Sequence, residues 1–191
     1  MATPRPLVLN LGLPKTGTTS IAAYFACNGW RSSHWNCGNA SKCAVCMMSW
    51  LVAVAQREHS GSRGWRERLD MSGELQRHCG DFDVFAEIDL QMHSACIYPQ
   101  VEHLHTLVRV LPKACFILTV RPMEHWLRSV RAWGLKPLSN RSSHVATYEP
   151  ERDTLLSKML SSCPILPRTE AGLLAWHSQH LERVSGSADS F

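Results

Sequence analysis

A short loop near the N-terminus has the residue types and the spacing that bind phosphate groups. It reads GLPKTGTT over residues 12–19 and joins an apolar run at 7–11 to an apolar-periodic segment at 18–26. Glycine lets the backbone turn tightly and approach phosphate oxygens, and the amides at a helix N-terminus attract anions. Lys15 can reach a bound phosphate from within the loop, and the threonines can donate hydroxyls. The segment therefore predicts an anion site between a strand and a helix.

The same loop lacks the lysine that nucleotide-hydrolysing P-loops carry after their second glycine. The spacing G-x-x-x-x-G is followed here by Thr18 and Thr19 in place of Lys and Ser or Thr. In an NTPase that lysine contacts the β- and γ-phosphates, and the next hydroxyl binds magnesium. Its absence counts against a kinase or an ATPase. The alternative without function is a strand-loop-helix turn with chance glycines.

A second pair of candidate phosphate ligands lies in the segment CFILTVRPMEHWLRSVRAWG. Arg121 follows an apolar run, and Ser129 comes eight residues later in the next predicted helix. An arginine at a strand end and a serine two turns into a helix can converge on one phosphate. Taken singly, Arg121 is equally well read as a surface salt-bridge arginine and Ser129 as a tolerated helix serine.

The two motifs together resemble those of the PAPS-dependent sulfotransferases, where PAPS is 3′-phosphoadenosine 5′-phosphosulfate. In that family a PKTGTT-type loop holds the 5′-phosphosulfate, and an arginine followed eight residues later by serine holds the 3′-phosphate. FILTVRPMEHWLRSV and AWHSQHLERV are especially similar to the small-protein branch found in algae, fungi and other eukaryotes. The resemblance implies transfer of a sulfuryl group from PAPS to a hydroxyl or amine acceptor. The implied PAPS ligands are Pro14, Lys15, Thr16, Gly17, Thr18, Thr19, Arg121 and Ser129.

Such a transfer needs charge stabilisation on the leaving oxygen and a base for the acceptor. Lys15, with the loop amides and threonine hydroxyls, is the candidate for the first task. The segment DVFAEIDLQMH offers Glu87, Asp89 and His93 for the second. Strand alternation puts Glu87 and Asp89 on one face, with Asp89 nearer the carboxyl end. The related branch has an acidic residue at about this point, so Asp89 is the predicted base, with His93 in reserve and a capping role for Asp89 as the alternative.

Cysteines gather in the segment SSHWNCGNASKCAVC, which contains Cys37, Cys43 and Cys46. The spacing of Cys43 and Cys46 is typical of zinc sites, and Cys27 or His34 can supply a further ligand. A zinc ion bound there would pin an otherwise irregular loop. A disulfide and free thiols remain the alternatives, because only one such cysteine pair is present.

The elements that must position these residues alternate between strand and helix. Short apolar runs predict buried strands over residues 7–11, 84–90 and 115–120. Apolar periodicity predicts helices over residues 18–26, 46–58, 100–110, 122–133 and 169–184. This order implies a parallel sheet covered on both faces, with ligands beyond the carboxyl ends of its strands. We therefore expect one α/β domain over residues 1–184, a P-loop-NTPase-like three-layer α/β/α sandwich, with a disordered tail at 185–191.

Composition limits the class of function. The 191 residues suffice for one domain, and 45% apolar with 19% charged residues is globular composition. A net charge of +4 argues against a dedicated nucleic-acid binder but suits a small polyanionic ligand. No run approaches a membrane span, and the N-terminal apolar stretch is too short for a signal peptide, so a cytoplasmic protein with reduced thiols is expected.

The C-terminal sequence LERVSGSADSF departs from the resemblance. Family members generally continue into another strand and a loop that covers the nucleotide. A degenerate nucleotide-binding or interaction protein is therefore the main alternative to an active transferase, and a P-loop kinase is a weaker one. Nothing in the sequence identifies the acceptor or the oligomeric state.

Overall fold

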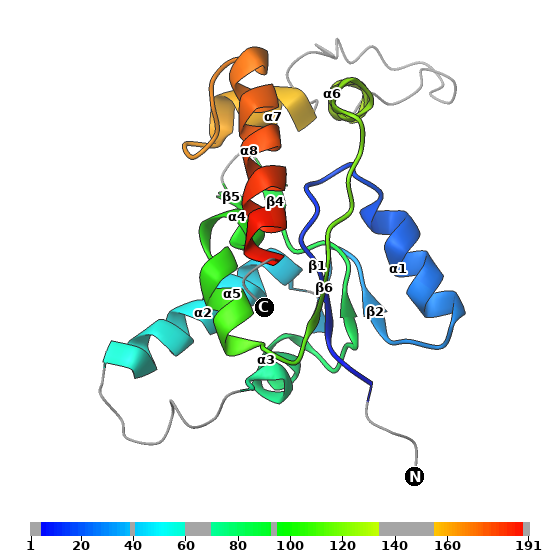
Figure 1. The fold of residues 1–191 in the computed structure, drawn as a ribbon, viewed down its shortest axis with the longest axis vertical. Helices are drawn as coiled ribbons and strands as arrows, with labels where there is room; N and C mark the ends of the chain where they lie inside the picture. The colour runs from blue at the N-terminus through cyan, green and yellow to red at the C-terminus, as the bar shows by residue number, and fades with distance from the viewer. Residues whose placement is uncertain (1–4, 39–40, 60–69, 93–94, 134–154, 189–191) are drawn as a thin grey trace, which may run out of the picture.

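The computed structural model describes residues 5–38, 41–59, 70–92, 95–133 and 155–188, and its centre is a four-stranded parallel sheet (Figure 1). The strand order β2-β3-β1-β6 joins β1 (Val8–Asn10), β2 (Ser32–Ser33), β3 (Val84–Phe85) and β6 (Cys115–Ile117). β1 lies between β3 and β6, with Val8 opposite Val84 and Cys115. The loop that follows β1 thus leaves from the middle of the sheet.

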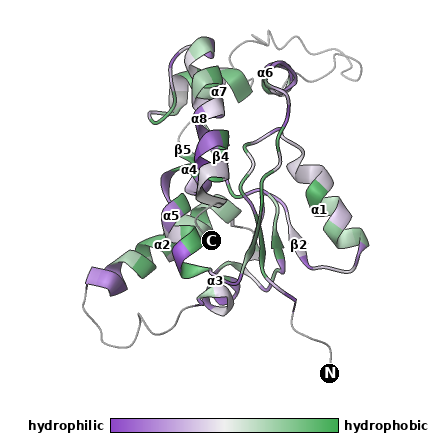
Figure 2. Ribbon diagram, in the orientation of Figure 1, coloured by the Kyte–Doolittle hydropathy of each residue, from purple (hydrophilic) through white to green (hydrophobic). Residues whose placement is uncertain are grey.

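Helices cover both faces of this sheet, as alternation along β1 requires. Leu9 packs in one apolar cluster with Trp50 and Leu107, whereas Val8 packs in another with Phe25. The first cluster lies under α2 (Cys43–His59), α3 (Ser72–Cys79) and α5 (Leu104–Val110), and the second lies under α1 (Thr18–Cys27). Figure 2 shows hydrophobic residues concentrated in the strands, while the far end of α2 is hydrophilic. The predicted three-layer α/β class is confirmed.

A second group of elements stands above the carboxyl edge of the sheet (Figure 1). It comprises the antiparallel pair β4 (Leu90–Met92) and β5 (Ala95–Ile97), with α4 (Pro99–Glu102), α6 (Met123–Ala132), α7 (Leu155–Ser162) and α8 (Glu170–Ala188). A separate apolar cluster unites them around Tyr98 and Trp126 and includes Leu13 from the loop that follows β1. No helix among the described residues is both long and apolar enough to cross a membrane.

Several predicted boundaries are wrong: the strand expected over 115–120 ends at Ile117, and the helix expected over 100–110 is divided into α4 and α5 at His103. The strand expected over 84–90 ends at Phe85, and Leu90 begins β4 of the smaller sheet. Backbone pairing of β3 with β1 stops at Phe85, and the carbonyl of the next residue, Ala86, accepts from a side chain, Nδ2 of Asn10 at 2.9 Å. α8 extends to Ala188, so the predicted tail is helical over residues 185–188.

Candidate functional site

A cavity of about 520 Å³ opens beyond the carboxyl ends of β1, β3 and β6. Its walls come from the phosphate loop (residues 12–19), the start of α1, the segments after β2 and β3, and α6. The lining residues are Pro14, Lys15, Thr16, Gly17, Thr18, Thr19, Ser20, His34, Trp35, Glu87, Gln91, Val120, Arg121, Ser129, Trp133 and Leu155. All eight residues predicted to hold PAPS are among them, although the two motifs are about a hundred residues apart in the chain.

The phosphate loop approaches β6 so closely that residue 12 must be glycine. A Cβ atom on Gly12 would lie 2.7 Å from both the carbonyl oxygen of Thr119 and the hydroxyl of Thr16, and closer still to the Thr119 hydroxyl. Gly17 has φ of 115° and Lys15 has φ of 68°, both in the left-handed region. These two residues reverse the chain so that the loop enters α1 directly.

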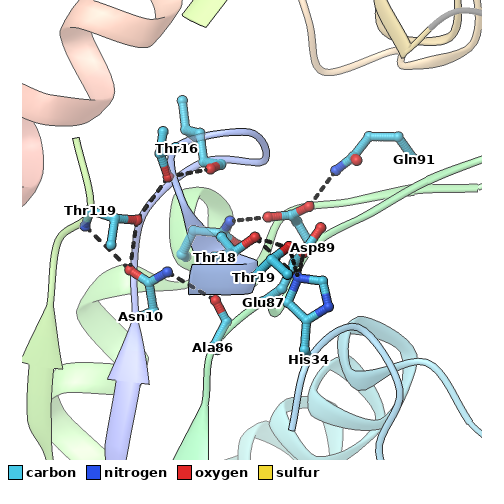
Figure 3. A network of polar contacts seen from close by, with 12 residues as sticks. Asn10, Thr16, Thr18, Thr19, His34, Ala86, Glu87, Asp89, Gln91 and Thr119 are labelled. Atoms are coloured by element: carbon cyan, nitrogen blue, oxygen red, sulfur yellow. Dashed lines mark hydrogen bonds and ion pairs between the residues drawn. The ribbon is translucent and has the colours of Figure 1, made fainter. Parts of the chain in front are cut away.

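Asn10, at the end of β1, fastens the loop to both neighbouring strands (Figure 3). Its Nδ2 donates to the carbonyl of Ala86, and its Oδ1 accepts from the Gly12 amide at 3.1 Å and the Thr119 hydroxyl at 3.1 Å. The Thr119 hydroxyl in turn lies 2.7 Å from that of Thr16. Asn10 is buried, and a lone amide inside the apolar run LVLNLG is the one feature of the sequence that points to it.

The N-terminus of α1 faces the cavity without a capping side chain. Gly17 is the N-cap, and no acidic residue occupies the first turn. The first amides of a helix have no partner within it, and the helix dipole makes that end positive. Thr18 and Thr19 add hydroxyls at the same point. This end of the cavity can hold an oxyanion.

Helix α6 braces the loop from the other side. The indole Nε1 of Trp126 donates to the carbonyl of Pro14 at 2.9 Å, and Nη1 of Arg121 donates to the carbonyl of Lys15 at 2.9 Å. The ammonium of Lys15 lies 5.2 Å from the centroid of the Trp133 ring. Burial lowers the pKa of the Lys15 ammonium, the charge of Glu87 opposes that shift, and Arg121 adds to it.

A carboxylate and an imidazole meet at the start of α1 (Figure 3). Oε2 of Glu87 accepts a hydrogen bond from the Thr18 hydroxyl at 2.8 Å and lies 2.5 Å from Nε2 of His34. That imidazole nitrogen is also 3.2 Å from the hydroxyls of Thr18 and Thr19. The sequence singled out His34 only as a zinc ligand, because its partner Glu87 is distant in the chain.

Asp89, the predicted base, is buried and does not line the cavity. Its two carboxylate oxygens accept hydrogen bonds from Gln91 Nε2 at 2.7 Å and Gln100 Nε2 at 3.0 Å. Burial, and then the charge of Glu87, raise the pKa of the Asp89 carboxyl well above its ordinary value. The reserve candidate, His93, lies outside the described residues.

The thiols predicted to bind zinc form disulfides instead. Cys37 is bonded to Cys43, and Cys46 is bonded to Cys79. Cys43 and Cys46 are neighbours on α2, yet their partners come from different segments, so the thiols do not converge on one point. Cys27 is free and exposed, and the described part of the chain holds no group of three or more His, Cys, Asp or Glu suited to a metal ion. The zinc prediction is corrected accordingly.

A third disulfide, between Cys96 and Cys163, connects β5 to the segment between α7 and α8. The two cysteines are 67 residues apart in sequence, and their Cα atoms are 5.2 Å apart. Sequence inspection treated both as scattered thiols.

Comparison with known protein families gives one match. A family model described as a sulfotransferase domain matches residues 7–189. The matched region contains the phosphate loop, the arginine-serine pair and α8. A search of curated proteins found no match.

Proposed function

Because this chain belongs to the sulfotransferase family, we propose that it transfers a sulfuryl group from PAPS to a hydroxyl or amine acceptor. One observation carries the proposal: a single cavity is lined both by the loop at the start of α1 and by Arg121 with Ser129. Two separated anion-binding elements suit a ligand with phosphate groups at two positions.

The residues present fit PAPS in size and charge. The cavity of about 520 Å³ falls within the range of roughly 300–1,000 Å³ usual for ligand sites. In our proposal the α1 amides, including that of Thr18, together with Lys15 and the Thr19 hydroxyl bind the 5′-phosphosulfate, while Arg121 and Ser129 bind the 3′-phosphate; the Thr18 hydroxyl donates to Glu87. PAPS carries the sulfuryl group on its 5′-phosphate, and that phosphate is a good leaving group.

The chain then contributes charge stabilisation and a proton acceptor. Glu87 takes the acceptor proton as the acceptor oxygen or nitrogen bonds to sulfur. Lys15 stabilises the charge on the phosphate oxygen when the bond between that oxygen and sulfur breaks. The products are the sulfated acceptor and 3′-phosphoadenosine 5′-phosphate. Pre-organised geometry carries much of the work, as in phosphoryl transfer.

We assign the base role to Glu87 in preference to Asp89. Glu87 lines the cavity beside Thr18, with 15% of its side chain exposed, whereas Asp89 is enclosed and has both oxygens engaged by amides. A base must come within hydrogen-bond reach of the proton it accepts. His34 contacts Glu87 and can hold its carboxylate in position.

We also propose an oxidising compartment in place of the predicted cytoplasm. Disulfides persist mainly in oxidising surroundings, and three are present here. Mass spectrometry of the protein purified from its native source, with free thiols alkylated before reduction, tests this. Alkylation of all eight cysteines before reduction would show that the thiols are reduced and would favour the cytoplasm instead.

Calorimetric titration with 3′-phosphoadenosine 5′-phosphate, run beside ATP with magnesium, tests the cofactor. Tight binding of the first and little of the second is expected. Preference for ATP would favour a kinase. Binding of neither would favour a degenerate protein that has kept the fold without the nucleotide site.

A further inference from the structure

The two sides of the cavity differ in chemistry. The phosphate loop follows β1, which lies between β3 and β6 in the sheet order β2-β3-β1-β6. The β6 side carries Arg121 and Ser129, which the proposed function gives to the nucleotide. The β2 and β3 side carries His34, Trp35 and Glu87, and it therefore faces the acceptor.

Trp35 is held firmly on this side. Its φ of 62° lies in the left-handed region, which is uncommon for a bulky residue and must be imposed by its surroundings. The Trp35 carbonyl accepts from the amide of Cys43 at 2.9 Å, and Cys43 is in turn disulfide-bonded to Cys37, two residues after Trp35. The ammonium of Lys42 lies 3.4 Å from the ring centroid and covers one face of the indole, and Trp35 also lines the cavity, whereas Lys42 does not.

The polar side chain of Gln91 is fixed on the same side. Gln91 lines the cavity, and its Nε2 donates to Oδ1 of Asp89 at 2.7 Å. Asp89 is itself buried and held by Gln100. The side-chain amide of Gln91 is therefore held in one orientation at the cavity wall. Together with Glu87, it places two polar groups on the same side of the cavity as Trp35.

We propose that this side of the cavity binds a saccharide acceptor, a conclusion that rests on the proposed function. A sugar ring has an apolar C–H face that packs on an indole and a rim of hydroxyls that need acceptors. One hydroxyl loses its proton to Glu87 and gains the sulfuryl group from PAPS, while a second hydrogen-bonds the side-chain amide of Gln91. A simple phenol has no second hydroxyl for this contact.

Transfer assays with PAPS test the substrate class. The probes are the methyl glycosides of glucose, galactose and N-acetylglucosamine, with 4-nitrophenol as the competing class, and products are read by mass spectrometry. Sulfation of at least one glycoside faster than the phenol is expected. Faster transfer to the phenol, or no transfer to any glycoside by protein that binds 3′-phosphoadenosine 5′-phosphate, would overturn the saccharide site. Failure of that nucleotide to bind would overturn the proposed function itself, and this inference with it.

Variants of two cavity tryptophans test the division between the two sides. Trp35→Ala is expected to raise KM for the glycoside roughly tenfold, leaving nucleotide affinity within about twofold, and Trp35→Phe to recover part of the loss. Trp133→Ala, on the opposite side near Lys15, is the control and should weaken nucleotide binding instead. Far-UV circular dichroism and thermal unfolding report whether each variant is folded. If Trp35→Phe or Trp35→Ala weakened the nucleotide and left the glycoside KM unchanged, the assignment would be wrong.

Discussion

The buried indole of Trp126 donates a hydrogen bond to the carbonyl of Pro14 at 2.9 Å. Trp126 lies on α6 between Arg121 and Ser129, and Pro14 belongs to the phosphate loop, so this bond couples the two motifs directly. Neither motif can move independently of the other without breaking it.

Replacing Trp126 by Phe should therefore affect both stability and binding. The Pro14 carbonyl would lose its partner in a buried position, which costs about 1–3 kcal/mol. Urea unfolding should show that loss, and calorimetry should show weaker binding of 3′-phosphoadenosine 5′-phosphate. Trp50→Phe is a matched control, because Trp50 is equally buried and its Nε1 has no partner among the described residues. Equal nucleotide affinity in the two variants would argue against the coupling.

Lys15→Ala should lower kcat by roughly 100- to 1,000-fold, the usual effect of removing a group that stabilises transition-state charge. The melting temperature should change little, since Lys15 makes no buried side-chain hydrogen bond among those described. Single-turnover transfer and thermal unfolding measure the two effects. A large fall in melting temperature with unchanged turnover per folded molecule would contradict the assigned role.

Arg121→Ala should weaken a ligand with a 3′-phosphate while barely affecting one without it. Loss of a charge-assisted bond is expected to cost about 1.5–3 kcal/mol of binding free energy. Titrations with 3′-phosphoadenosine 5′-phosphate and with adenosine 5′-phosphate make the comparison. Arg128→Ala is the control, because it removes the same charge from an exposed site on α6 that does not line the cavity. Equal weakening of the binding of both nucleotides would contradict the assignment of Arg121 to the 3′-phosphate.

Glu87→Gln and Asp89→Asn should separate the two acidic candidates. Without its base the Glu87 variant should lose roughly 100- to 10,000-fold in kcat while it still binds nucleotide. The Asp89 variant would face two amide donors with an amide of its own, so its main loss should be in stability. Turnover per folded molecule distinguishes them. The assignment is reversed if Asp89→Asn is catalytically dead, fully folded and nucleotide-binding.

Protonation of His177 should make the folded protein less stable in mild acid. It is buried against the Trp126 ring with both ring nitrogens unpartnered among the described residues, and burial, then the charge of His180, lower its pKa. A lowered pKa keeps His177 neutral in the folded protein. Its contribution to the free energy of unfolding is therefore complete above the ordinary histidine pKa of about 6.5 and is lost as the pH falls towards the pKa of His177 in the folded protein. Urea unfolding between about pH 5 and pH 8 should show this slope. His177→Phe should flatten it, and an unchanged slope would exclude His177 as the cause.

Local patterns predicted the parts of the site that are themselves local. The strand, loop and helix around Lys15 are continuous in sequence, and the spacing of Arg121 and Ser129 is set by one helix start. Their apolar and glycine patterns carry enough information to identify them. The cavity that unites them follows from the parallel order of the strands.

What the sequence could not supply depends on contacts between distant residues. β2 consists of Ser32 and Ser33, which have no apolar signal and are placed by pairing with β3. The alternation used to select Asp89 assumed a strand that in fact ends at Phe85. Cys46 looked like a zinc ligand beside Cys43 because the two are close in sequence. Its disulfide partner, Cys79, approaches it through the packing of α2 on α3.

The bond between Cys96 and Cys163 closes a covalent ring that includes β6, Arg121 and the whole of α6. A protease that cuts the backbone once anywhere inside that ring cannot separate the two fragments. Nicked protein would run as one species on a gel until a reductant is added. The segment with Arg121 and Ser129 thus stays attached to the rest of the molecule even after its backbone is cut.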